Sequence, residues 1–248
     1  MSQASARPVL ILGARSDIAR ALAAEFARFG HPIQLAARDP RVLERDRADL
    51  SIRHQVEVTT NRYDALDIDR IEEFLDSLPE TPRIVVSVVG LVGDQDENAR
   101  NPTRASEVID TNFTGPALTL EAAARRLVEL DEDTAVIGIS SVAGDRGRAR
   151  NYIYGAAKAG FSEYLSGMRQ KYARTRVHVM TAKPGYVATT KTEDMDLPAI
   201  LTSTPEELAR AVVASLHRHR MVHYDLKWWL IMAVIKLIPE KIFSQLKF

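Results

Sequence analysis

Short apolar runs rich in β-branched residues alternate with segments of helical period along the whole chain, and no other feature constrains its fold as strongly. Parallel strands joined by crossover helices produce this alternation, so we expect a doubly wound α/β sheet of seven parallel strands with helices on both faces. The expected strands are 9–12, 33–37, 54–59, 84–89, 135–140, 177–182 and 221–224. The expected helices lie near 18–29, 40–50, 67–78, 103–130, 151–174 and 204–219.

Length and composition are those of one globular domain: 248 residues, of which 46% are hydrophobic and 27% charged. The 33 basic residues balance the 33 acidic ones, which argues against a nucleic-acid partner. The absence of cysteine excludes disulfides and thiolate catalysis. Residues 1–8 carry no export signal, and the longest apolar run, Trp228–Ile235, is far shorter than the ~20 residues of a membrane span. We expect a cytoplasmic protein.

The turn after the first strand is a candidate phosphate site, because ligands of such sheets bind beyond the carboxyl ends of the strands. Gly13 lets the backbone approach a pyrophosphate, and Ser16, Asp17 and Ile18 lead into a helix whose free N–H groups attract anions. A single glycine after a strand is more often part of an ordinary turn, and the stretch lacks the G-x-G-x-x-G fingerprint. The turn alone is therefore weak evidence for a dinucleotide site.

Two arginines near this turn bear on the choice of cofactor. Arg38 follows the second strand, with Arg15 close by, and an arginine at this place accommodates the 2′-phosphate of NADP. Asp64, beyond the third strand, is either an adenine contact or the cap of a turn. These residues favour NADP over NAD, although Arg38 taken alone is more typical of a solvated surface arginine.

Ser141, Tyr154 and Lys158 form the candidate catalytic set. Tyr154 and Lys158 are four residues apart in an expected helix, so their side chains share one face. A lysine cation favours the phenolate and lowers the pKa of tyrosine from about 10, which suits general acid–base chemistry near neutral pH. The Ser141 hydroxyl can hydrogen-bond a carbonyl oxygen that becomes an alkoxide.

Five motifs in order resemble those of the short-chain dehydrogenase/reductase family over essentially the whole chain. The motifs are the Gly13 turn, Asn112 in Thr111-Asn112-Phe113-Thr114-Gly115, Ser140-Ser141 with Ala143-Gly144, Tyr154-Gly155-Ala156-Ala157-Lys158, and Pro184-Gly185-Tyr186-Val187-Ala188-Thr189. The interval 154 − 141 = 13 matches the family and selects Ser141 rather than Ser140. The resemblance implies one Rossmann-type domain over 1–248.

The resemblance also implies roles for individual residues and an oxidoreductase that needs no metal. Tyr154 is the implied general acid, Ser141 orients the substrate carbonyl, and Asn112 fixes a water in a proton relay. Lys158 lowers the tyrosine pKa and holds the nicotinamide ribose. The implied cofactor contacts are Gly13, Arg15, Ser16, Asp17, Ile18, Arg38, Asp64, Gly90, Tyr154, Lys158, Pro184, Gly185, Val187 and Thr189.

The chain departs from the family pattern at two cofactor positions. Asp17 and Ala19 stand where the second and third glycines of the turn usually fall. A carboxylate facing the pyrophosphate would repel it, so we expect Asp17 to turn aside and cap the helix. After the fourth strand, Ser87-Val88-Val89-Gly90 replaces Asn-Asn-Ala-Gly and keeps only the glycine.

The C-terminal part bears on the substrate. Residues 186–205 are irregular and match the substrate lid of the family, or else form an acidic surface loop. The apolar tail, 226–248, holds both tryptophans and suits either peripheral membrane contact or packing on the domain or a partner subunit. The tail and the turn at 16–18 are similar to those of decaprenylphosphoryl keto-pentose reductases.

These observations favour reduction of a bulky or lipophilic ketone, with a lipid-linked sugar among the candidates. A keto-acyl or small-ketone reductase is the alternative within the same class. A non-catalytic sensor of NADP(H) is the alternative from another class. Asp17 and the altered motif after the fourth strand favour it, and the complete catalytic set disfavours it. The family resemblance further implies a homodimer or homotetramer built on the helices near 103–130 and 151–174.

Overall fold

A seven-stranded parallel sheet forms the centre of the computed structural model, which describes residues 7–193 and 196–246. The strand order is β3-β2-β1-β4-β5-β6-β9, and every neighbouring pair runs parallel. The strands are β1 (Val9–Leu12), β2 (Ile33–Ala37), β3 (Val58–Arg62), β4 (Ile84–Ser87), β5 (Thr134–Ile139), β6 (Val177–Lys183) and β9 (Val222–Tyr224). The doubly wound sheet expected from the alternation is therefore confirmed.

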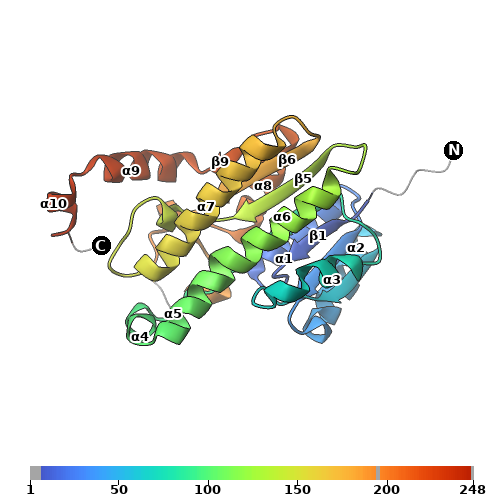
Figure 1. Cartoon of the computed structure of the whole chain (residues 1–248), viewed down its shortest axis with the longest axis horizontal. Helices are drawn as coiled ribbons and strands as arrows, with labels where there is room; N and C mark the ends of the chain where they lie inside the picture. The colour runs from blue at the N-terminus through green and yellow to red at the C-terminus, as the bar shows by residue number, and fades with distance from the viewer. Residues whose placement is uncertain (1–6, 194–195, 247–248) are drawn as a thin grey trace.

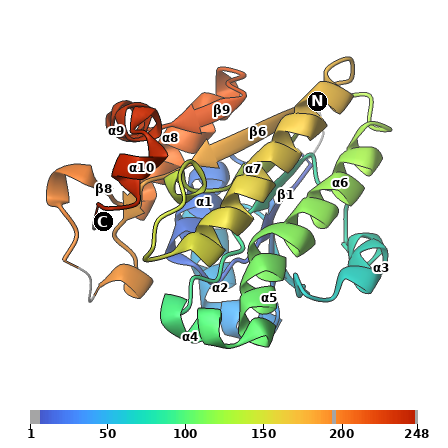
Figure 2. The same ribbon diagram turned by 60° about the vertical axis from the view of Figure 1, so that its left-hand side comes forward.

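Helices cover both faces of the sheet (Figures 1 and 2). One face packs against α1 (Asp17–Arg28), α2 (Glu44–His54) and α8 (Pro205–His217), and its buried core includes Leu22, Phe26 and Val212. The other face packs against α3 (Ile71–Asp76), α6 (Gly115–Leu127) and α7 (Tyr152–Tyr172). Figure 1 shows α6 and α7 side by side across the front of the sheet. This two-sided burial explains the continuous apolar runs of the central strands.

The strand order reverses between β1 and β4, and the turns after these strands lie in close contact. Gly13 ends β1 with a φ of +79°, a left-handed conformation that side chains rarely adopt. A Cβ on Gly13 would lie 3.0 Å from the nitrogen of Val89. A residue with a side chain would therefore push apart the two strands that frame the switch point, where doubly wound folds bind ligands.

The structure corrects two details of the expected elements. The third strand begins at Val58 rather than at His54, because α2 extends to His54. Gln55 caps the end of this helix with a φ of +56°. The first helix, expected near 18–29, ends at Arg28, and the Phe29 side chain that follows it is 48% exposed.

The sequence also did not indicate several short elements. The helical stretch expected near 103–130 is divided into α5 (Pro102–Ile109), a π-helical turn (Asp110–Thr114) and α6. A further helix, α4 (Gln95–Arg100), precedes α5. The expected lid contains β7 (Tyr186–Val187) and β8 (Thr202–Ser203), which pair in parallel. Residues 194 and 195 of that segment lie outside the described residues.

The expected tail forms two helices, α9 (Leu226–Leu237) and α10 (Glu240–Phe243), at one end of the molecule (Figure 1, red). One stripe of α9 is buried, since Trp228 and Met232 pack with Val142 from the loop after β5. Among residues 7–193 and 196–246, no helix combines the length and apolarity needed to cross a bilayer. Residues 247 and 248, at the end of the tail, lie outside the described part.

Candidate active site

Two adjacent serines follow β5, and their hydroxyl groups are used differently. Ser140 is 3% exposed, and its hydroxyl donates to the carbonyl oxygen of Lys158 (2.9 Å). The same hydroxyl is hydrogen-bonded to the Ser162 hydroxyl (2.7 Å). Ser140 thus fastens α7 to the strand. Ser141 is half-buried, and its Oγ accepts a hydrogen bond from the Ala143 N–H (3.1 Å). Of the two, Ser141 is the serine whose hydroxyl reaches Tyr154.

Lys158 is held at the carboxyl edge of the sheet by the strands themselves. Its Nζ donates to the carbonyl oxygens of Val89 (3.2 Å) and Ile139 (3.1 Å), the residues beyond β4 and at the end of β5. The same nitrogen lies 5.8 Å from the ring centroid of Tyr154. The expectation that Tyr154 and Lys158 share one helix face is confirmed, and both meet Ser141 at the strand ends.

The surroundings of Tyr154 raise its pKa, whereas we expected Lys158 to lower it. Burial, which disfavours the charged phenolate, is the main cause. The hydrogen bond with Ser141 and the positive charge of Arg148 act in the opposite direction and offset part of this effect. The protonated phenol is therefore the stable form of Tyr154 in this structure.

Asn112 lies in the π-helical turn and is fully buried. Its Nδ2 donates to the carbonyl oxygens of Leu91 (2.5 Å) and Val108 (2.7 Å), and its Oδ1 accepts from the Leu91 N–H (3.2 Å). The side chain thus joins the helix to the loop after β4, close to Gly90. A π-helical turn of this kind is frequent at functional sites.

A cleft of about 360 Å³ lies at the switch point between β1 and β4. Six of the expected cofactor contacts line this cleft: Gly13, Arg15, Ser16, Arg38, Asp64 and Gly90. Ser16 caps α1 by accepting from the Ala19 N–H (3.1 Å), which leaves the helix N-terminus beside the cleft.

The residues of this cleft fit a dinucleotide with a 2′-phosphate. Arg15 and Arg38 are exposed and line the same cleft. Asp39 is the neighbouring carboxylate that could instead bind ribose hydroxyls, but its oxygens accept hydrogen bonds from Arg41 at 2.9 and 3.0 Å. Arg41 is the main cause of the lowered pKa of Asp39. Asp39 is therefore engaged by Arg41, while Arg15 and Arg38 line the cleft next to it.

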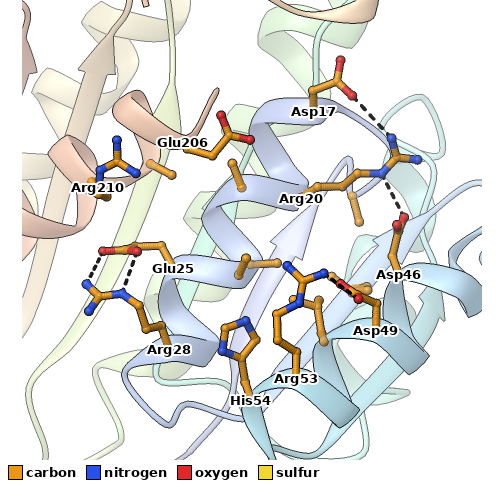
Figure 3. Close-up of a pocket in the computed structure, with 17 residues that line it drawn as sticks. Asp17, Arg20, Glu25, Arg28, Asp46, Asp49, Arg53, His54, Glu206 and Arg210 are labelled. Atoms are coloured by element: carbon orange, nitrogen blue, oxygen red, sulfur yellow. Dashed lines mark hydrogen bonds and ion pairs between the residues drawn. The ribbon is translucent and has the colours of Figure 1, made fainter. Parts of the chain in front are cut away.

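Asp17 turns away from the cleft, as expected, but it does not cap α1, since Ser16 does. Its carboxylate accepts from the Thr190 N–H (2.8 Å) and pairs with Arg20 (3.4 Å). Asp17 lines a different pocket of about 390 Å³ between α1, α2 and α8 (Figure 3). There Arg20 also binds Asp46, and Arg53 binds Asp49, so the charges of that pocket largely compensate one another.

Four of the remaining expected contacts lie in or next to β7, away from the switch-point cleft. Pro184, Gly185 and Val187 line a separate pocket with β8 and α8. The indole of Trp228 covers Gly185 so closely that a Cβ added to Gly185 would lie 1.9 Å from the indole Nε1. Thr189 takes part in the cap of the turn at Thr190–Thr192. Ile18 packs against the core beneath α1.

Comparison with known proteins identifies the family. A family model described as short chain dehydrogenase matches residues 7–198. An oxidoreductase of Mycobacterium tuberculosis is 32% identical over 251 residues, covering 99% of both chains. The chain belongs to the short-chain dehydrogenase family. The expectation of an oxidoreductase of this family is confirmed.

Two solved structures show the same fold as this short-chain dehydrogenase. A short-chain dehydrogenase from Sphingobium yanoikuyae in complex with NADPH has a TM-score of 0.75 at 22% identity, covering 97% of this chain and 96% of that one. The bulky-bulky ketone specific alcohol dehydrogenase from Comamonas testosteroni has a TM-score of 0.78 at 21% identity, covering 98% and 96%.

Sequence reasoning missed Asp145, whose side chain is 3% exposed directly beyond the Ser141 loop. Its carboxylate accepts from Lys183 Nζ (2.8 Å) and from the Tyr224 hydroxyl (2.7 Å), and Lys236 Nζ lies 3.6 Å away. Burial raises the pKa of Asp145, but these partners outweigh it and the net pKa is lowered. The partners come from distant parts of the chain, so no local spacing could have revealed the cluster.

Proposed function

We propose that this short-chain dehydrogenase is an NADP(H)-dependent oxidoreductase that transfers a hydride between the nicotinamide and a ketone or secondary alcohol. The observation that carries the proposal is the meeting of Ser141, Tyr154 and Lys158 at the strand edge. The same edge bears the cleft with Arg15 and Arg38. Family membership supports the reaction class.

In this proposal each side chain handles a proton or a charge at the substrate oxygen. Tyr154 donates its phenolic proton to that oxygen during reduction, and Ser141 donates a hydrogen bond to it. Lys158 stabilises the phenolate that remains, and it also holds the nicotinamide ribose. Asn112 supports the relay that returns a proton to Tyr154. NADPH, when bound, supplies the hydride.

A panel of bulky ketones tests the reaction class directly. We expect NADPH to be oxidised with at least one of them, and NADPH fluorescence to report binding in the absence of any ketone. Binding of NADPH with no turnover across the panel would contradict the proposed reductase and favour the sensor.

The preference for NADP over NAD is tested at Arg38. Loss of a guanidinium contact to a phosphate costs about 1.5–3 kcal/mol, so we expect Arg38→Ala to raise the KM for NADPH about 10- to 100-fold. The KM for NADH should stay nearly unchanged. Arg45→Ala, an exposed arginine outside the cleft, is the matched control. Equal increases for both cofactors in Arg38→Ala would contradict the assignment.

A bulky, lipophilic substrate is supported by the apolar cluster beside Ser141. Trp228 and Met232 of α9 pack there against Val142. Further apolar or aromatic side chains flank them: Tyr186, Leu201, Tyr224, Ile231 and Ile235. The Comamonas protein of the same fold is named for bulky-bulky ketones. We infer that this cluster and the segment 186–205, as a substrate lid, enclose the apolar part of the substrate, such as the chain of a lipid-linked sugar.

Contact with a membrane surface is supported by the outer side of α9 and α10. Seven apolar side chains there are more than a third exposed: Leu226, Trp229, Leu230, Val234, Leu237, Ile242 and Leu246. Lys227 and Lys241 lie among them, which suits anionic lipid head groups. We expect the protein to float with vesicles rich in phosphatidylglycerol. A variant with Trp229, Leu230 and Val234 changed to serine should stay in the soluble fraction, and equal partitioning of the two proteins would contradict the contact.

Assembly as a homodimer or homotetramer is supported by exposed apolar side chains on the helices at one face. Ile109 of α5, Leu118 of α6 and Val128 after it are each about 40% exposed. Light scattering should give a dimeric or tetrameric mass, which Leu118→Glu lowers. A monomeric mass for the unmodified protein would contradict the proposed assembly.

A further inference from the structure

The Asp17 carboxylate binds two partners that are far apart in the chain. Its Oδ2 accepts from the Thr190 N–H (2.8 Å), beyond β7, and its Oδ1 pairs with Arg20 Nη1 (3.4 Å). Arg20 Nε also binds Asp46 Oδ2 of α2 (3.0 Å), and Figure 3 shows the three charged groups in a row. Both carboxylate oxygens of Asp17 are thus engaged outside the switch-point cleft.

The turn that Asp17 holds is bonded to β7 and forms one unit with it. The Thr189 N–H donates to Thr192 Oγ1 (2.9 Å), and the Thr192 hydroxyl donates to the Val187 carbonyl oxygen (2.8 Å). A restraint on the Thr190 N–H therefore also restrains Val187 and Thr189. The family resemblance implies both as cofactor contacts, although they lie outside the switch-point cleft.

The other end of this link lies at the cofactor turn. Asp17 is the first residue of α1 and directly follows Ser16, which lines the switch-point cleft with Gly13. The family pattern has a glycine at position 17, and a glycine has no side chain to accept from the Thr190 N–H. The Asp17 side chain is 26% exposed, so water competes only partly for this hydrogen bond.

We propose that Asp17 is a positioning residue that fixes the turn after β7 against the start of α1 and so aligns the two halves of the dinucleotide site. The assignment rests on the proposed use of NADP(H). Without the bond to Thr190, binding of the cofactor has to order the turn, and the free energy of ordering weakens the binding. The cleft with Arg15 and Arg38 does not depend on this turn, so the adenosine half should bind as before.

Two ligands of different length test this role. NADPH reaches both halves of the site, whereas adenosine 2′,5′-bisphosphate carries the adenosine half alone. We expect Asp17→Ala to raise the Kd of NADPH about 3- to 10-fold, the loss of one hydrogen bond, and to leave the Kd of the bisphosphate unchanged. Glu206→Ala, which removes an exposed carboxylate from the first turn of α8 in the same pocket, should change neither Kd. Equal weakening of both ligands in Asp17→Ala, or no weakening of NADPH, would overturn the assignment.

A second variant and hydrogen exchange identify the bond responsible. Asparagine keeps an oxygen that accepts from the Thr190 N–H, so Asp17→Asn should bind NADPH within about twofold of the unmodified protein. In the absence of cofactor, the amides of 186–193 should exchange faster in Asp17→Ala than in Glu206→Ala or the unmodified protein. Equal exchange rates, or an NADPH loss in Asp17→Asn as large as in Asp17→Ala, would overturn the positioning role. Ketone reduction enters neither measurement, so a protein that binds NADPH without turnover would refute the reductase alone.

Discussion

The protonation of Tyr154 depends on three opposing influences at a single side chain. Burial raises its pKa, while the hydrogen bond with Ser141 and the charge of Arg148 lower it. Carbonyl reduction needs the phenol as proton donor, and alcohol oxidation needs the phenolate as acceptor. In the proposed mechanism, Tyr154 is therefore present at neutral pH in the protonated form that carbonyl reduction requires.

Removing the Ser141 hydroxyl should shift the pH dependence in one direction. Ser141 lowers the pKa of Tyr154, so Ser141→Ala raises it, and the phenolate forms only at higher pH. We expect the rising limb of kcat/KM for alcohol oxidation to move to higher pH in this variant. Ser166→Ala, an exposed serine of α7, should leave the limb in place. A shift to lower pH in Ser141→Ala would contradict this account.

At the scale of elements, the loop after Ser141 connects the active site to the C-terminal helices. Asp145 binds Lys183 of β6 and Tyr224 of β9, and Arg146 stacks over the ring of Phe243 in α10, with 4.3 Å between its Cζ and the ring centroid. Asp17, at the start of α1, accepts a hydrogen bond from the Thr190 N–H. The start of α1 and the segment after β7 are thus joined by a side chain.

Asp145→Asn should loosen α9 and α10. The change leaves Lys183 partly buried without its counter-ion, at a cost of about 2–3 kcal/mol. Because the folded pKa of Asp145 is lowered, its stabilising effect is complete above the unfolded value near 3.8 and is lost as pH falls through the folded pKa. Limited proteolysis should cut the C-terminal segment faster in Asp145→Asn, and in the unmodified protein below pH 4. Glu163→Gln, an exposed control, should match the unmodified protein at neutral pH.

Most elements could be predicted because burial on both faces makes a central strand a continuous apolar run, as in Val9–Leu12 and Ile84–Ser87. The strand β3 lies at the sheet edge and has polar side chains, so its start was misplaced. The proximity of Ser141 and Tyr154 could be expected from the order of their motifs. The Asp145 cluster could not, because Lys183, Tyr224 and Lys236 come from distant parts of the chain.

At the scale of the whole molecule, the start of α6 lies very close to the loop after β3. A Cβ on Gly115 would lie 1.8 Å from the carbonyl oxygen of Ala65. Asn112 and the π-helical turn immediately precede this contact. The position of α6 therefore depends on this close approach, which directly follows the turn that carries Asn112.

Gly115→Ala should lower the melting temperature by about 5–10 °C, because the clash with backbone cannot be relieved by a rotamer change. Gly167→Ala is the matched control. It lies in α7 with nothing within 4 Å of the added Cβ, so the gain in helix propensity should raise stability slightly. Differential scanning calorimetry of the two variants makes the comparison, and equal changes in Tm would contradict the packing described for α6.

The rate of hydride transfer in Tyr154→Phe tests the central role of the phenol most directly. NADPH oxidation is followed with a ketone that the unmodified enzyme reduces, alongside NADPH binding by fluorescence, and Tyr152→Phe serves as an exposed control on the same helix. Loss of the proton donor should lower kcat by about 10²- to 10⁴-fold while NADPH still binds, with Tyr152→Phe near the unmodified rate. A Tyr154→Phe enzyme that keeps its kcat would contradict the account.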